Sequence, residues 1–555
     1  MHKFSSLKRA ALPCWVWALL LLAASAQAQV KIPSDALSTQ GEIEEILQHG
    51  RTLEAKKQWG EALTHYEEAY RKHSDRQDLR QRMQLARVHY NLRRRYQDPT
   101  FIKSLRELSE AETLDIYAQI LYKLDINYYR TLDWRNLCRH GAANLDIALT
   151  TPVFLNKHLP KTPAPRIQTF REELRRKVDG LAIRSRYEAR DAALLAARMA
   201  EESLGLSSQT VLMEFVCGAI CALDQYSCFL TRGQLEDVMS QIEGEFVGLG
   251  IELKARQKTL EVVGVIRGGP AEEAGVRRGD RIIAVDSKQT EEISPDAAAD
   301  LLKGPEFSRV ELLLEGFDGR RRSLQVTRRK VEVPSVDDIK IVDPQYNIAY
   351  FRLASFQKTT RREVDQALMQ LHRQKMQGLI VDLRGNPGGL LTASVEAADR
   401  FLNDGVIVST RGRNVRENFE YRAHTANTWS IPLVVLIDED TASASEIFSG
   451  AMRDHNRAVV IGQQSYGKGS VQGIFPLQVG GVGVRMTTAK FYSPNGQAIS
   501  NRGVTPNMVV RQMYKPALQG ETNLEPKWGG DRDLGLQTAL GIARQKVVQR
   551  SARRP

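Results

Sequence analysis

Hydrophobic positions follow three different spacings along the 555-residue chain. From residue 41 to about 239 they recur every three or four residues, which predicts amphipathic helices interrupted by the proline-rich stretch LPKTPAPR (159–166). From Gly244 they alternate, as in GEFVGLGIEL and TLEVVGVI, which predicts a β-rich module of about 90 residues. Beyond it, apolar runs such as GLIVDLR and LVVLID alternate with helical stretches. This arrangement predicts an α/β core whose chemistry gathers at the carboxyl ends of the strands.

The first helical segment resembles one tetratricopeptide-like helix pair. The stretch GRTLEAKKQWGEALTHYEEAY places small and aromatic residues at the expected spacing: Gly50, Leu53, Ala62, Tyr66 and Ala69. A single such unit cannot bury its faces alone. Two interpretations therefore stay open: the pair docks a protein, such as an adaptor, or it packs as ordinary helices against the segment that follows.

The first residues predict a secretory signal. Lys3, Lys8 and Arg9 precede the apolar run Trp15–Ala24, and the following AQAQ supplies the small-x-small pattern for cleavage after Ala28. An uncleaved membrane anchor is the alternative, but the run is short against the roughly 20 residues that a span needs. We therefore expect an exported protein of the periplasm or cell envelope. No later segment is long and apolar enough to cross a membrane.

The net charge of +12 does not predict a nucleic-acid protein. Basic residues are scattered, as in NLRRRY and DGRRRS, without interleaved aromatic residues or zinc-finger spacing. Peripheral attraction to an anionic envelope surface and a simple solvated face both explain the charge.

The cysteines predict no metal site. After removal of Cys14 with the signal, four remain, and three of them have the spacing C-x3-C-x6-C, which lacks the paired C-x-x-C of zinc knuckles. We favour packed thiols and leave one disulfide open; the four are Cys138, Cys217, Cys221 and Cys228. No cofactor or metal is predicted.

Three strand ends of the predicted core carry unusual residues. In DLRGNPGG, Gly388 and Gly389 can present backbone N–H groups in a space too tight for a side chain, as an oxyanion hole requires. In LIDEDTASASEIF, small neighbours would expose the Ser443 hydroxyl at a helix start, although an ordinary N-cap serine is the alternative. In VVIGQQSYGKGS, Lys468 stands between glycines.

The segment around Lys468 is one residue short of the phosphate-binding loop G-x-x-x-x-G-K-[ST]. Gly469 replaces the required hydroxyl, and the residues after it do not predict a helix, so we exclude a nucleotide site. Lys468 can instead serve as general base for Ser443 if burial, without a close carboxylate, lowers its pKa from about 10.4 toward 7. No acidic residue stands near it in the sequence, and Gln472 is expected on the same strand face, where it could orient the amine.

The β-rich module resembles a PDZ domain. GLGI matches the carboxylate-binding loop of that family, and PAEEAGVRRGDRIIAVD matches the segment that follows it in bacterial members. Backbone N–H groups of such a loop can bind an anion, and the next strand offers an edge with which a peptide can pair. The resemblance implies that the C-terminus of a peptide binds at Gly248, Leu249, Gly250 and Ile251.

The peptidase-like motifs resemble the carboxy-terminal processing proteases, also called tail-specific proteases or peptidase family S41, of bacterial envelopes and the chloroplast lumen. They are TASASEIFSGAMRDHNRAVVIGQQSYGKGSVQ, LIVDLRGNPGGLL, MTTAKFYSPNGQAIS and GVTPN, within a likeness that covers about residues 204 to 510. The resemblance implies a serine endopeptidase with a Ser-Lys dyad that cleaves envelope proteins after its PDZ domain binds their free C-termini. It assigns these roles: nucleophile Ser443, base Lys468, orienting partner Gln472, oxyanion donors Ala444 and Gly388 or Gly389, and accessory acid Asp454.

We therefore expect a multidomain α+β protein with a tetratricopeptide-like helical N-terminal region, a PDZ domain and an α/β serine peptidase core. The predicted boundaries are 1–28 for the signal peptide, 29–100 for the tetratricopeptide-like segment, 101–239 for further helices, 240–332 for the PDZ domain, 333–515 for the peptidase core and 516–555 for a C-terminal tail.

Some features depart from the family pattern. The helices before about Gly205 are not explained by the resemblance, and LDQYSCFL has Gln225 and Cys228 where other residues are common, which we connect with regulation rather than chemistry. A Ser-His-Asp hydrolase would need a G-x-S-x-G elbow, which does not occur in the sequence. The remaining alternative is a non-catalytic, peptide-binding scaffold on a peptidase-like core, but the serine and the lysine are both present.

Overall fold

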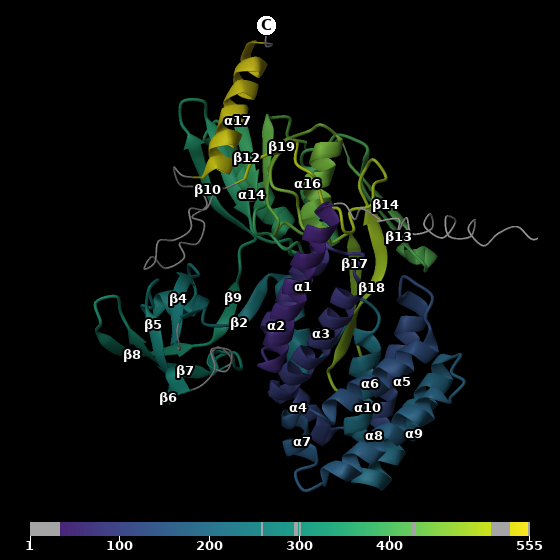
Figure 1. Ribbon diagram of the computed structural model, residues 1–555. Coiled ribbons are helices and arrows are strands. Elements are labelled where there is room, and N and C mark those ends of the chain that lie inside the picture. Colours follow the sequence, from purple (N-terminus) through teal and green to yellow (C-terminus); the bar gives the residue numbers. More distant parts are fainter. Residues whose placement is uncertain are drawn as a thin grey trace, which may run out of the picture. The chain divides into compact units, whose positions relative to one another are not determined.

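The computed structural model describes residues 34–256, 259–292, 298, 301–424, 426, 428–511 and 533–552 (Figure 1). The chain divides into two compact units between Tyr90 and Asn91. The predicted signal segment, with Cys14, lies outside the described residues. Within the described part of the chain, no helix combines the length and the apolar character that crossing a bilayer requires.

The first unit is built from packed helices around Tyr66. Its elements are α1 (Ser34–Ala55), α2 (Trp59–Lys72) and most of α3 (Gln77–Gln97). A Cβ atom on Gly50 would lie 2.3 Å from the Tyr66 ring, so only glycine allows α1 and α2 to approach this closely. The Tyr66 hydroxyl donates a hydrogen bond to Glu54 Oε1 over 2.8 Å, which satisfies its polar end inside the packed pair. The structure confirms the helix pair, whereas docking of a partner on it stays a prediction.

The second unit begins with a helical region that has its own core. Its helices are α4 (Pro99–Glu107), α5 (Glu110–Asn127), α6 (Trp134–Ala148), α7 (Pro152–His158), α8 (Ala164–Asp179), α9 (Arg186–Leu204), α10 (Ser208–Cys221) and α11 (Arg232–Glu243). α10 is buried along almost its whole length, and its Glu214 carboxylate pairs with Arg95 over 2.6 Å. Among the described residues, Cys138, Cys217, Cys221 and Cys228 form no disulfide, which confirms the packed thiols.

The alternating segment folds into a β-sheet with the strand order β3-β4-β5-β7-β8, and β6 pairs with β5. The strands are β3 (Ile251–Arg256), β4 (Thr259–Val265), β5 (Arg281–Val285), β6 (Lys288–Gln289), β7 (Arg309–Glu315) and β8 (Arg321–Thr327), with the short helix α12 (Pro270–Glu273) and the 3-10 turn η1 (Thr290–Glu292). β2 (Glu245–Gly248) pairs separately with β9 (Arg329–Glu332). β3 is an edge strand of this sheet in the described chain, as peptide addition would require.

The core that follows is a sheet with the order β10-β11-β12-β15-β16-β19, in which only the β10–β11 pair is antiparallel. Its strands are β10 (Val336–Asp343), β11 (Ile348–Leu353), β12 (Gly378–Asp382), β15 (Leu433–Ile437), β16 (Val459–Gly462) and β19 (Met508–Val509). Helices α14 (Thr360–Arg373), α15 (Leu391–Asp399) and α16 (Ala444–Asp454) bury their apolar residues against one face. The buried strands read as near-continuous apolar runs because both faces are covered.

The other face is covered by α17 (Leu534–Ala552), which lies at the yellow end of the chain in Figure 1. Leu536, Ala539, Leu540 and Ala543 pack there against the strands, so the prediction of a C-terminal tail over 516–555 was wrong for this part. The spacing of these residues is that of one helix face, and the sequence alone could have indicated it.

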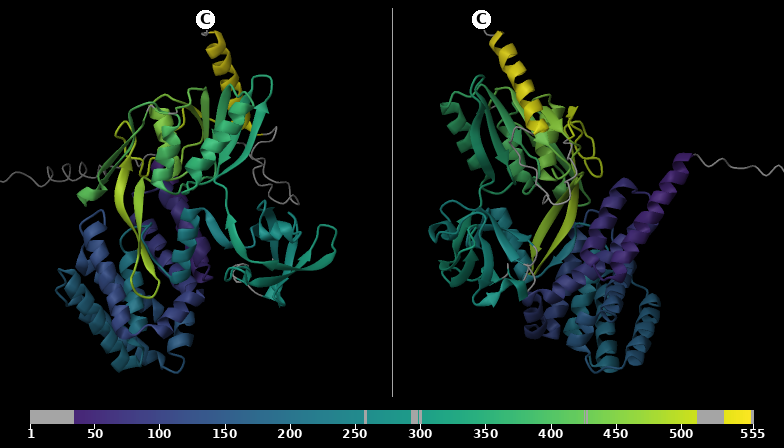
Figure 2. Two further views of the ribbon diagram at one scale, coloured as in Figure 1. Left: turned by 180° about the vertical axis from the view of Figure 1, so that it is seen from behind. Right: turned by 60° about the vertical axis from the view of Figure 1, so that its left-hand side comes forward.

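A second sheet joins the α/β core to the helical region. Its order is β1-β18-β13-β14, with β17 paired to β18. These strands are β1 (Cys228–Leu230), β13 (Val406–Gly412), β14 (Phe419–Arg422), β17 (Ser470–Pro476) and β18 (Gly483–Tyr492), and the 3-10 turn η2 (Val415–Glu417) lies between β13 and β14. The β17–β18 hairpin extends from the core into the helices, where Leu477, Val482, Val484 and Met486 join the helical core (Figure 2).

Candidate active site

The three predicted strand ends meet at one edge of the α/β sheet. β12 ends at Asp382, β15 at Ile437 and β16 at Gly462, and the parallel register pairs Asp382 with Leu436 and Ile437 with Gly462. Parallel strands have their carboxyl ends on the same side, where open α/β sheets bind their ligands. The structure therefore brings the loops of Gly388, Ser443 and Lys468 to one side of the sheet, as predicted.

Ser443 occupies a strained backbone conformation at the start of α16. Its φ of 56° and ψ of −116° lie outside the regions that non-glycine residues ordinarily adopt. Such strain costs roughly 1–3 kcal/mol and persists only where the surroundings enforce it. The residue is half-buried at the N-cap position, as the N-cap alternative expected, and its role as nucleophile stays a prediction.

The surroundings that enforce this conformation are hydrogen bonds to the DLRGNPGG loop. The Asn386 carbonyl oxygen accepts from the Ala442 amide over 3.0 Å and from the Ser445 hydroxyl over 3.1 Å. The Thr441 hydroxyl donates to the Leu383 carbonyl over 3.0 Å. The serine loop and the glycine loop are thus held together on both sides of Ser443.

Gly388 lies directly against Ser443. A Cβ atom on it would lie 2.7 Å from the Ala442 carbonyl oxygen and 2.8 Å from both the Ala444 nitrogen and Ser443 Cβ. Its own amide donates to Asn386 Oδ1 over 2.9 Å and is therefore engaged. Within the described chain, the amides of Ala444 and Gly389 have no hydrogen-bond acceptor. Of the predicted oxyanion donors, these two are the ones available to a substrate oxygen.

We expect Gly388→Ala to lower kcat by about 10²-fold, because the new methyl group would displace Ser443 or Ala444 and a misplacement of about 1 Å has an effect of this size. The matched control is Gly496→Ala: Gly496 also has a positive φ, but a Cβ atom there has no neighbour within 4 Å. Steady-state kinetics on folded protein compares the two variants. Equal activities in both would contradict a close approach of Gly388 to the reacting atoms.

Lys468 is half-buried, and its amine lies over the ring of Tyr226, 5.3 Å from the ring centroid. Burial lowers the pKa of the Lys468 amine, the Arg485 charge lowers it further, and the Glu446 carboxylate raises it. The direction agrees with the predicted base. Among the described residues, no hydrogen bond joins the Lys468 amine to the Ser443 hydroxyl.

Glu446 is a site residue that the sequence analysis missed. One carboxylate oxygen accepts from the Ser443 amide over 2.7 Å and the Lys468 amide over 2.9 Å; the other accepts from the Gly467 amide and the Ser465 hydroxyl, both over 2.6 Å. Burial raises the pKa of Glu446, and these four donors lower it. The expectation of no close carboxylate was therefore wrong, because the fold brings Glu446 to the lysine loop.

A sequence signal for Glu446 was present. Ser443 and Glu446 have the S-x-x-E spacing of a capping box, in which the glutamate reaches back to the N-cap amide. Because the buried carboxylate also accepts amides from the lysine loop, it fixes the backbones of the two loops relative to one another. The Glu446 carboxylate binds the backbone amide of Lys468, whereas the side-chain amine of Lys468 lies over the Tyr226 ring.

Gln472 does not reach Lys468 in this structure. Its amide nitrogen donates to the Ser470 carbonyl over 3.0 Å and to the Ser470 hydroxyl over 2.9 Å. The register of β17 against β18 shifts between Val471 and Gln472, so the simple alternation from which we expected a shared face does not hold there.

Asp454 lies at the opposite end of α16 from Ser443. Its carboxylate is 2% exposed and pairs with Arg453 over 2.6 Å, and it also accepts from the Asn495 amide over 3.4 Å. The structure therefore separates this predicted accessory acid from Ser443.

The predicted carboxylate-binding loop has free donors. In the described chain, the Leu249 and Gly250 amides have no acceptor, whereas the carbonyls of the same residues accept from Ala271 and Ile266 over 2.8 Å each. The loop is thus anchored by its oxygens and leaves its N–H groups for a ligand beside the open edge of β3.

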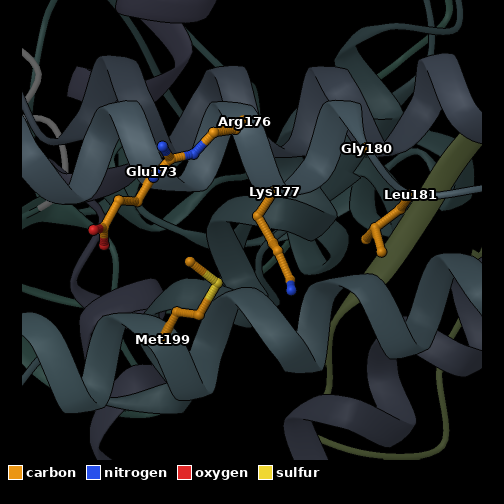
Figure 3. A pocket seen from close by; sticks show the side chains of 6 residues that line it. All are labelled: Glu173, Arg176, Lys177, Gly180, Leu181 and Met199. Carbon is orange, nitrogen blue, oxygen red and sulfur yellow. The ribbon is translucent and has the colours of Figure 1, made fainter.

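A pocket of about 470 Å³ lies elsewhere, along α8 and α9 (Figure 3). It is lined by Glu173, Arg176, Lys177, Gly180, Leu181 and Met199. Its lining includes no residue of the Ser443 site. Among the described residues, no group of histidine, cysteine and carboxylate side chains is arranged to hold a metal ion.

Comparison with known proteins agrees with the fold. The family model for peptidase family S41 matches residues 347–510, and a PDZ domain model matches residues 261–316. The carboxy-terminal-processing protease of Bartonella bacilliformis is 36% identical over 318 residues, which cover 56% of this chain and 72% of that protein. The carboxyl-terminal-processing protease of Synechocystis sp. is 35% identical over 302 residues, which cover 53% and 69%. The chain therefore belongs to the carboxy-terminal processing proteases of peptidase family S41 and carries a PDZ domain.

Proposed function

We propose that this peptidase is an exported serine endopeptidase in which Ser443 is the nucleophile and Lys468 the general base. The observation that carries the proposal is the Glu446 carboxylate, which holds the strained Ser443 and the lysine loop together from inside the protein. Strained, half-buried serines beside a lysine with a lowered pKa have the features of an activated nucleophile.

In the proposed cycle, the Ser443 hydroxyl attacks the peptide carbonyl while neutral Lys468 accepts its proton. The Ala444 and Gly389 amides stabilise the oxyanion, and the leaving amine takes the proton back from Lys468. Water then hydrolyses the acyl-enzyme, with Lys468 again as base. The amine must move from the Tyr226 ring to Ser443 for the first step, and Gln472 orients it there after its own side chain leaves Ser470.

The PDZ domain is proposed to bind the free C-terminus of the substrate. The Leu249 and Gly250 amides supply donors for the carboxylate, and the edge of β3 accepts the preceding residues as an added strand. We further propose that the substrates are envelope proteins. The net positive charge of the chain is proposed to attract the enzyme to an anionic envelope surface. The helix pair of the first unit is proposed to dock an adaptor protein.

The proposal is tested on an unstructured polypeptide with an apolar C-terminus, without ATP and in the presence of a chelator. Wild-type protein is expected to release fragments that mass spectrometry identifies, and Ser443→Ala is expected to release none. Cleavage by Ser443→Ala at the wild-type rate would exclude the nucleophile, and a requirement for added ATP would restore the phosphate-loop interpretation of GKG.

The same substrate with a C-terminal carboxamide tests the PDZ part separately. Loss of the terminal charge removes charge-assisted hydrogen bonds worth about 1.5–3 kcal/mol, so we expect KM to rise about tenfold or more with little change in kcat. Equal KM values for the two substrates would contradict carboxylate binding and leave the dyad untouched.

A further inference from the structure

The segment LDQYSCFL, which the resemblance left unexplained, contacts the lysine. It follows α10, and its Tyr226 ring lies under the Lys468 amine. The carbonyl oxygen of the same Tyr226 accepts a hydrogen bond from Arg485 Nε over 3.3 Å. Arg485 is on β18 and stands opposite Cys228 of β1 in the antiparallel register. One residue, Tyr226, thus touches both the base and a second cation.

Arg485 has no carboxylate partner among the described residues. Its side chain is half-buried, and its other polar neighbour is the Cys228 thiol. A half-buried guanidinium without a counter-ion is costly, so its place on Tyr226, the residue that the Lys468 amine also contacts, calls for an explanation other than stability.

We propose that Arg485 is a positioning residue for the base: bound to the Tyr226 carbonyl, it holds a second cation on the residue whose ring contacts the Lys468 amine, and so helps to keep that amine able to accept the Ser443 proton. The inference rests on the proposed Ser-Lys function. It assigns to the LDQYSCFL segment a part in the chemistry, where the sequence analysis had connected it with regulation.

The other ionisable groups near Lys468 favour its charged form or stay neutral. Glu446 on α16 faces the lysine loop and favours the charged amine. Tyr226 stays neutral because burial raises its pKa, and its ring face also favours a cation. Tyr466 and Asp224 are further ionisable neighbours of Tyr226. Burial and Arg485 are the two influences that oppose the charge on Lys468.

The test is the pH dependence of kcat/KM, whose acidic limb reports deprotonation of the base in the free enzyme. In Arg485→Gln this limb is expected to move to higher pH, because the neutral side chain no longer opposes the ammonium. At a fixed pH on the limb, each unit of displacement lowers kcat/KM about tenfold, and activity recovers in alkaline solution. Arg485→Lys, which keeps the charge, is expected to leave the limb near its wild-type position.

Arg320→Gln is the matched control, since it removes the same charge from an 89% exposed side chain on the β7–β8 turn. Arg485→Met provides a second neutral variant if the glutamine variant does not fold. A loss of activity that is equal at every pH, or a limb that does not move in the neutral variants, would overturn the inference. Activity in Lys468→Ala would instead overturn the dyad itself, so the two failures are distinguishable.

Discussion

Lys468→Ala is expected to lower kcat by about 10⁴-fold or more, the size of loss that follows removal of the base from a serine peptidase. Without the amine, the Ser443 hydroxyl has no proton acceptor of suitable pKa. Glu446 cannot take over, because its two oxygens already accept four hydrogen bonds. The loss is measured on the unstructured substrate, with circular dichroism as the check on folding.

Lys468→Arg makes this test sharper. Arginine keeps the positive charge and the long side chain, but its pKa above about 12 prevents it from acting as a base. If Lys468 accepts a proton, the arginine variant is as inactive as the alanine variant. If Lys468 binds a negative group of the substrate instead, arginine preserves much of the activity, and this outcome would contradict the proposed role.

The position of the site could be predicted because it depends on sheet topology. Gly388, Ser443 and Lys468 each follow an apolar run, and parallel strands must have their carboxyl ends together. The same logic explains why the phosphate-loop interpretation fails: the residues after Gly469 form β17, and no helix N-terminus follows the lysine. Assignment of roles to these residues depended on the family resemblance and not on spacing.

The partners of these residues were harder to predict because they come from elsewhere in the chain. Tyr226, which contacts Lys468, lies beside Arg485 because β1 and β18 pair across more than 250 positions of sequence. The contacts of Gln472 could not be predicted from alternation, because Lys468 lies before β17 and the register shifts between Val471 and Gln472. Glu446 and α17, in contrast, have local signals in the sequence: a capping box at Ser443 and Glu446, and an apolar helix face in α17.

The helix α17 is joined to the DLRGNPGG loop by a buried ion pair. Arg384 of the DLRGNPGG loop donates to both oxygens of Asp533 over 2.7 Å each, and it also binds Asp382. The side chains of Asp533 and Arg384 are 0% and 5% exposed. The Asp533 carboxylate further accepts from the Leu536 amide over 3.0 Å, and so caps the helix.

Asp533→Asn is therefore expected to lower the free energy of unfolding of the peptidase core by about 3 kcal/mol, since it leaves a buried guanidinium with one of its two counter-ions. Because the same loop carries Gly388, we also expect kcat to fall. Denaturant unfolding followed by tryptophan fluorescence, with activity measured in parallel, checks both effects.

The control comes from the same helix. Arg544 of α17 pairs with Asp343 over 2.6 Å, but its side chain is 49% exposed, and the amides of Gln345 and Tyr346 still bind Asp343 without it. Arg544→Gln is expected to cost about 1 kcal/mol or less and to leave kcat unchanged. If the two variants were equally stable and active, we would conclude that α17 only covers the sheet and does not support the DLRGNPGG loop. A large loss confined to Asp533→Asn would show that the DLRGNPGG loop depends on the C-terminal helix, through a contact more than 140 positions away in the sequence.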